Sequence, residues 1–222
     1  MYYKIIPTSN LRIIGKHPQI ETGHFPVNLD SDPRSSKNFW FQEADIEKMV
    51  FPEPIVNPKS NLTDYMPCSF AGTRSMPLVS KQLMEFLKSV ADRKVQFIPS
   101  TVWHNSIAID DYFYMNCYES SYELVDFEKT TIRWSTISSD KRNNQLVKVD
   151  NLNSFLELER TLKPPLSLCM DPIYFNRNFS AEFFFLSRVS SGWAYYVSDE
   201  VKSTIINKGF TGLEFIDANQ IC

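Results

Sequence analysis

Few residues of this chain have the types and spacing that catalysis or metal binding requires. Its three histidines, His17, His24 and His104, lie far apart in the sequence. There is no HExxH motif, no paired Cys/His spacing and no carboxylate-rich loop, so we expect neither a metal site nor a cofactor. The chain also lacks a GxSxG nucleophile motif and the glycine-rich motifs that hold phosphates. The sequence therefore predicts a protein that is not an enzyme and has no catalytic residues.

Two individual residues could still take part in catalysis, one as a general base and the other as a nucleophile. His104 precedes Asp110 and Asp111, and a carboxylate could orient it as a general base. The alternative, which we favour, is an exposed loop at 103–105 with the two aspartates as turn formers. Cys117 falls on the apolar face of a predicted strand, where a cysteine behaves as a small buried hydrophobe rather than a nucleophile.

The segment from Val95 to Glu128 has the most distinctive composition, because it is acidic, rich in tyrosine and free of Lys and Arg. Exposed tyrosines are typical of protein interfaces, and flanking carboxylates accelerate association with a basic partner. We therefore take this segment as the candidate binding surface. Its candidate contact residues are Asp110, Asp111, Tyr112, Tyr114, Tyr118, Glu119 and Glu123. In the alternative, a helix or the N-terminal segment covers the tyrosines and the acidic residues are only solvated turns.

The spacing of apolar residues predicts an α+β fold with mixed or antiparallel sheets and a few helices. Ser80 and Ser198 are predicted N-caps, and Gly209 closes the last helix. The predicted helices are 80–90, 151–162 and 198–208, and the predicted strands are 1–7, 95–98, 112–118, 130–137, 182–186, 193–197 and 213–216. Pro99 is expected to end one strand, Asp110 and Asp111 to form a turn, and 138–144 to form a loop.

We expect a single domain over residues 1–222. Residues 1–61 are predicted to be an irregular, proline-rich arm packed on a core at 62–217. Within the core, residues 79–98 align without a gap with 197–216, each as a capped helix followed by a strand. This match indicates two similar units in one sheet, or simply the common appearance of any amphipathic helix followed by a buried strand.

Composition limits the class of partner and the location. The net charge of −3 argues against nucleic acid, whose phosphates require clustered Lys and Arg. The apolar runs are far shorter than the roughly 20 residues of a membrane span, and the first residues do not form a secretory signal. The four cysteines form no CxxC pair, which favours reduced thiols. We therefore expect a soluble, cytoplasmic protein without a membrane partner.

Several segments resemble one known family. The sequence is similar to the immunity proteins of bacterial polymorphic toxin systems in four places. These are Val79–Leu83 with Val95–Pro99, the run Tyr112–Asn116 followed by Asp126, Ile173–Arg177, and the ending from Val197 to Phe215. The group most similar is the eleventh immunity family, formerly a domain of unknown function. The resemblance covers about residues 62 to 217 and consists mainly of packing residues.

The resemblance implies a cytoplasmic antitoxin that binds and neutralises a cognate toxin protein, and it supplies no catalytic residues. Our leading hypothesis is such an immunity protein, with the acidic tyrosine strand in its interface. If the toxin is a basic nuclease, Asp110, Asp111, Glu119 and Glu123 could stand in for nucleic-acid phosphates. Two alternatives stay open. One is a small hydrolase or transferase whose active site has no recognised motif, and the other is a regulatory adaptor without any toxin.

Overall fold

The computed structural model describes residues 1–36, 42–68, 76–91, 95–136, 144–176, 180–190 and 192–218. These residues form an α+β fold with two mixed six-stranded sheets, so the predicted fold class is confirmed. Contacts divide the chain into two compact units. Unit 1 contains Met1–Ile5, Ser120–Glu200 and Phe215–Cys222, and unit 2 contains Ile6–Glu119 and Val201–Glu214. The boundary that we expected at residue 61, between an arm and a core, coincides with no boundary between the units.

The first sheet has the strand order β12-β1-β11-β10-β9-β8. Its strands are β1 (Tyr2–Pro7), β8 (Ile132–Thr136), β9 (Leu166–Met170), β10 (Phe183–Val189), β11 (Gly192–Ser198) and β12 (Leu213–Asp217). β1 pairs antiparallel with β11, from Tyr2 opposite Ser198 to Ile5 opposite Tyr195. All of these strands except β9 were predicted within a few residues. The predicted loop at 138–144 lies outside the described residues except for Asn144.

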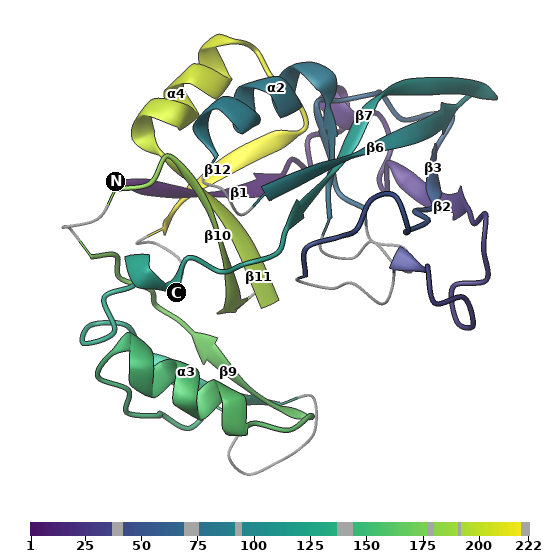
Figure 1. Ribbon diagram of the computed structural model, residues 1–222. Coiled ribbons are helices and arrows are strands. Elements are labelled where there is room, and N and C mark those ends of the chain that lie inside the picture. Colours follow the sequence, from purple (N-terminus) through teal and green to yellow (C-terminus); the bar gives the residue numbers. More distant parts are fainter. Residues whose placement is uncertain are drawn as a thin grey trace. The chain divides into compact units, whose positions relative to one another are not determined.

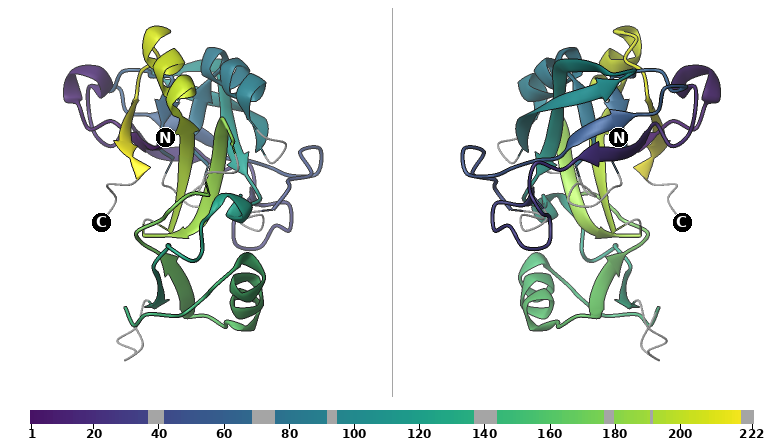
Figure 2. Two further views of the ribbon diagram at one scale, coloured as in Figure 1. Left: turned by 90° about the vertical axis from the view of Figure 1, so that its left-hand side faces the viewer. Right: turned by 90° about the vertical axis from the view of Figure 1, so that its right-hand side faces the viewer.

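The helix α3 (Leu152–Thr161) belongs to unit 1, where both views in Figure 2 show it alongside β9. Its helical start is explained by Asn151, whose side chain accepts a hydrogen bond from the backbone N–H of Ser154. Phe155 is fully buried, with its ring centroid 4.9 Å from that of Tyr122 and 5.2 Å from that of Phe127. This aromatic cluster anchors α3 to the core of unit 1, which confirms the predicted helix at 151–162.

The second sheet lies in unit 2 and has the order β2-β3-β6-β7-β5-β4. Its strands are β2 (Ile20–His24), β3 (Glu53–Val56), β4 (Tyr65–Met66), β5 (Leu78–Ser80), β6 (Val95–His104) and β7 (Ile107–Cys117). β2 and β3 come from the segment that we predicted to be irregular, so that prediction is wrong at both strands. Both sequences are short and carry little strand pattern, and β3 contains Pro54. Pairing with β2 and β6 gives β3 its extended conformation. The same segment also contains the short helix α1 (Leu11–Ile14).

Two longer helices, α2 (Lys81–Val90) and α4 (Asp199–Asn207), were both predicted. The side chain of Ser80 caps α2 by accepting a hydrogen bond from the N–H of Leu83. After α4 the chain reverses at Gly209, which has a φ of +73°. Figures 1 and 2 show α2 beside α4, and the rings of Phe86 and Phe210 lie 6.0 Å apart.

The two aligned segments of the sequence have equivalent topology in different sheets. Helix α2 connects β5 to β6, which lie on either side of β7. Helix α4 connects β11 to β12, which lie on either side of β1. Each helix thus connects two strands that are separated by one other strand. Val79 and Val197 are both buried, and so are Leu87 and Ile205. The expectation that the two aligned helix–strand segments share one sheet is therefore wrong. The match in topology and burial supports the duplication over a coincidence of pattern.

Candidate functional site

The acidic tyrosine segment folds mainly into a long hairpin of β6 and β7 in unit 2. The hairpin turns at Asn105 and Ser106, whose φ angles are +51° and +64°. Two successive residues with positive φ are typical of the tight turns whose twist matches that of antiparallel strands, and asparagine tolerates this conformation well. The predicted turn at Asp110 and Asp111 is therefore wrong, because both residues lie within β7.

Pro99 also lies inside a strand rather than ending it. It is paired with Phe113 of β7. On the opposite side of β6, strand β3 pairs only with Trp103 and His104. Proline lacks an N–H, but at this position no described neighbouring strand requires that donor, so β6 continues through it.

A β-bulge in the hairpin places two carboxylates on one face of the sheet. Ser100 pairs with Tyr112 and Val102 with Ile109, so Asp110 and Asp111 together lie opposite the single residue Thr101. The bulge reverses the alternation along β7, because Ile109 and Tyr112 both contact the same core although they are three residues apart. Asp110 and Asp111 therefore both lie on the opposite face, where both are exposed.

Two of the predicted contact tyrosines are buried. Tyr112 donates a hydrogen bond to the carbonyl oxygen of Thr63 at 3.1 Å, and Tyr114 donates one to that of Pro52 at 2.8 Å. Burial raises the pKa of Tyr112 to about 12, and it also raises the pKa of Tyr114. Pro52 of the N-terminal segment and Thr63, just beyond it, thus accept hydrogen bonds from these tyrosines, which agrees with our alternative interpretation that the tyrosines are covered. Tyr118, just beyond β7, is half-buried.

Replacing Tyr114 with phenylalanine should destabilise the protein by about 1–2 kcal/mol, because the buried carbonyl of Pro52 would lose its donor. Tyr196→Phe is a matched control, since Tyr196 is also buried but its hydroxyl has no hydrogen-bond partner among the described residues. We expect the control to change the free energy of unfolding by less than about 0.5 kcal/mol. Urea denaturation of both variants tests this, and equal losses would contradict the role given to the Pro52 contact.

The other two candidate carboxylates are not part of the bulge. Glu119 follows the far end of β7, so about 20 Å of strand separates it from Asp110 and Asp111. Glu123 belongs to unit 1. Of the three candidate carboxylates in unit 2, the structure brings Asp110 and Asp111 together and places Glu119 away from them.

Aromatic and polar residues of neighbouring strands share the face that carries these aspartates. Trp103 donates a hydrogen bond from its indole Nε1 to Glu53 Oε2 of β3 at 2.7 Å, and the ring of His24 lies 5.7 Å from the Trp103 ring. Thr101 donates a hydrogen bond to Asp110 Oδ1 at 2.8 Å. Sequence spacing alone did not indicate Trp103, Glu53 or His24, because they come from three different strands.

The two residues considered for catalysis are not supported by partners that would activate them. His104 contacts Asn105, and in the described part of the chain it makes no hydrogen bond to Asp110 or Asp111. Burial raises the pKa of the Cys117 thiol well above its ordinary value, which disfavours the reactive thiolate. This environment fits the predicted role of Cys117 as a core residue.

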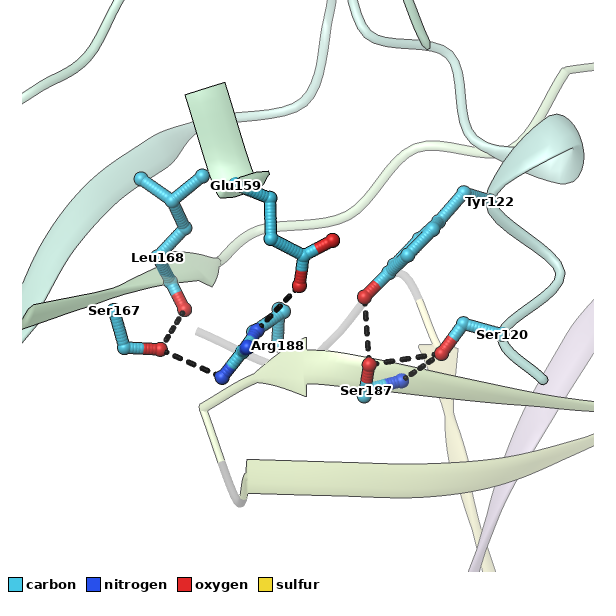
Figure 3. Close-up of polar contacts among 7 residues, drawn as sticks. All are labelled: Ser120, Tyr122, Glu159, Ser167, Leu168, Ser187 and Arg188. Atoms are coloured by element: carbon cyan, nitrogen blue, oxygen red, sulfur yellow. Dashed lines mark hydrogen bonds and ion pairs between the residues drawn. The ribbon is translucent and has the colours of Figure 1, made fainter. Parts of the chain in front are cut away.

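A polar cluster in unit 1 was not anticipated from the sequence (Figure 3). Arg188, which has a φ of +60° at a bulge in β10, donates hydrogen bonds to Glu159 at 2.7 Å and Ser167 at 3.0 Å. Beside it, the hydroxyl of Ser187 lies 2.6 Å from that of Tyr122. Burial raises the pKa of Tyr122, so its phenol remains protonated at neutral pH and cannot act as a base for Ser187. The cluster thus links α3, β9 and β10 by hydrogen bonds.

Unit 1 contains an open groove of about 870 Å³. Aromatic and acidic side chains line it, including Tyr2, Tyr174, Glu182 and Asp199. His104 and Cys117 are not among its lining residues and belong to unit 2. The groove therefore contains neither of the two residues that we considered for catalysis.

Comparison of the sequence with models of known protein families found no matching family, and comparison with curated proteins found no match. Within the described ranges, no group of three or more His, Cys, Asp or Glu side chains is arranged to hold a metal ion. The helices that the structure describes are all too short or too polar to cross a lipid bilayer.

Proposed function

We propose that this protein is an immunity protein that binds and neutralises a cognate bacterial toxin in the cytoplasm. The proposal begins from the resemblance of residues 62–217 to the immunity family. Its mechanism is stoichiometric binding, in which the protein covers the toxin's active site. A stable interface of this kind buries roughly 1,600 Å² in total.

The observation that carries the proposal is the exposed, acidic end of the β6–β7 hairpin. Ile107 at its turn is 64% exposed, and Ala108, Asp110 and Asp111 are also exposed. Strands β2, β3, β6 and β7 contain no Lys or Arg. A hairpin end that combines exposed apolar and anionic side chains favours a basic protein as the partner.

Co-expression with the C-terminal domain of the toxin encoded by the neighbouring gene tests the function. We expect restored growth and a complex that survives affinity purification and gel filtration. Restored growth without a complex would favour the enzymatic alternative instead. Failure of both would contradict toxin neutralisation and leave the adaptor hypothesis.

A further inference from the structure

The sheet of unit 2 has an uncovered area beside the turn of the β6–β7 hairpin. At the opposite end of β7, Met115 and Cys117 lie on the face that carries Asp111, and there both are buried. Figure 1 shows α2 over that end, with the hairpin turn extending beyond the helix. The exposed residues Ala108, Asp110 and Asp111 lie in the uncovered part.

In this area a half-buried tryptophan, Trp103, lies between carboxylates of two strands. Trp103 is paired with Ala108, which makes Asp110 its diagonal neighbour on the same face, at a typical separation of about 7–8 Å. On its other side, the hydrogen bond to Glu53 fixes the orientation of the indole ring. Asp111 extends the anionic area because the bulge keeps it on the same face as Asp110.

The charge of this face is not neutralised by its own strands. No Lys or Arg occurs on β2, β3, β6 or β7, and the described ion pairs include none with Glu53, Asp110 or Asp111. A cationic group that binds here would meet carboxylates that project from this face of the sheet and an aromatic side chain beside them. An arginine side chain fits best, because its planar guanidinium both stacks on aromatic rings and donates paired hydrogen bonds to carboxylates.

We propose that this face, formed by Trp103, Glu53, Asp110 and Asp111, is the docking site for an arginine side chain on the surface of the toxin. The inference rests on the proposed function and identifies the part of the protein that recognises the partner. Asp110 and Asp111 supply the charge, and Trp103 supplies the stacking surface. The preference for arginine over lysine follows from its planar shape.

A short peptide tests the site without the toxin. Acetyl-Gly-Arg-Gly-Arg-Gly-amide is titrated into ¹⁵N-labelled protein at low salt, and the indole Nε1–H resonance of Trp103, assigned with Trp103→Phe, is followed by NMR. We expect a saturable shift, and weaker binding of the corresponding lysine peptide. Asp110→Asn/Asp111→Asn should weaken binding of the arginine peptide at least about tenfold, which corresponds to about 1.4 kcal/mol.

Glu128→Gln/Glu157→Gln is the matched control, because it removes the same charge from exposed positions in unit 1 and should leave peptide binding unchanged. Equal weakening by both double variants, no shift at Trp103, or equal affinity for the lysine peptide would overturn the arginine site. A toxin complex that is unaffected by Asp110→Asn/Asp111→Asn would also overturn it while leaving the immunity function intact. Conversely, peptide binding without toxin binding would reject the function and retain the site.

Discussion

Replacing Gly212 with alanine is expected to lower the free energy of unfolding by at least about 3 kcal/mol. Gly212 has a φ of +89°, and a Cβ there would collide with the backbone oxygen of Tyr65 and lie 2.5 Å from Thr63 Oγ1. The surrounding backbone cannot easily move, because the N–H of Tyr65 donates to the carbonyl of Thr211 and the N–H of Thr8 donates to that of Gly212. Urea denaturation followed by circular dichroism measures the loss.

Gly209→Ala separates the two contributions to this cost. Gly209 has a similar φ of +73°, but no heavy atom lies within 4 Å of a Cβ built there. Only the conformational penalty of about 1–2 kcal/mol then applies. A loss at Gly212 no larger than that at Gly209 would show that the turn after α4 accommodates a methyl group.

Replacing Phe155 with alanine should cost about 3–5 kcal/mol, because this is the only fully buried residue of α3. The cavity would open against the rings of Tyr122 and Phe127 and detach the helix from the core of unit 1. Trp134 and Trp193 lie in unit 1, so tryptophan fluorescence during urea unfolding reports on this region.

Glu157→Ala provides the control on the same helix, since Glu157 is exposed and should change stability by no more than about 0.5 kcal/mol. An unfolding midpoint for Phe155→Ala within error of that control would mean that α3 contributes little to the unit. Loss of the native fold in Phe155→Ala but not in Phe155→Leu would agree with the predicted cavity.

Elements with strong local signals could be predicted from the sequence. α2 combines apolar residues at helical spacing with a capping serine, and α4 ends at a glycine that adopts the required positive φ. The order of helix and strand in both aligned segments was also correct. In these cases the residues that determine the structure are neighbours in the sequence.

The site depended on contacts between distant residues and was predicted only in part. Tyr112 and Tyr114 are buried because Thr63 and Pro52, about 50 to 60 residues earlier, return to accept their hydrogen bonds. Two adjacent aspartates were interpreted as a turn, although pairing with β6 makes them a bulge. The asparagine at 105 was the available signal for the actual turn.

The position of β1 has a consequence for synthesis on the ribosome. Its residues Tyr2–Ile5 pair with Tyr195–Ser198, which are made almost two hundred residues later. The first sheet therefore cannot form its β1–β11 ladder until residues 195–198 have been made, whereas every strand of the second sheet is complete by Cys117. The second sheet can begin to fold while residues 120–200 of unit 1 are still being translated, so the early strand β1 must remain available, and protected from aggregation, for most of that time.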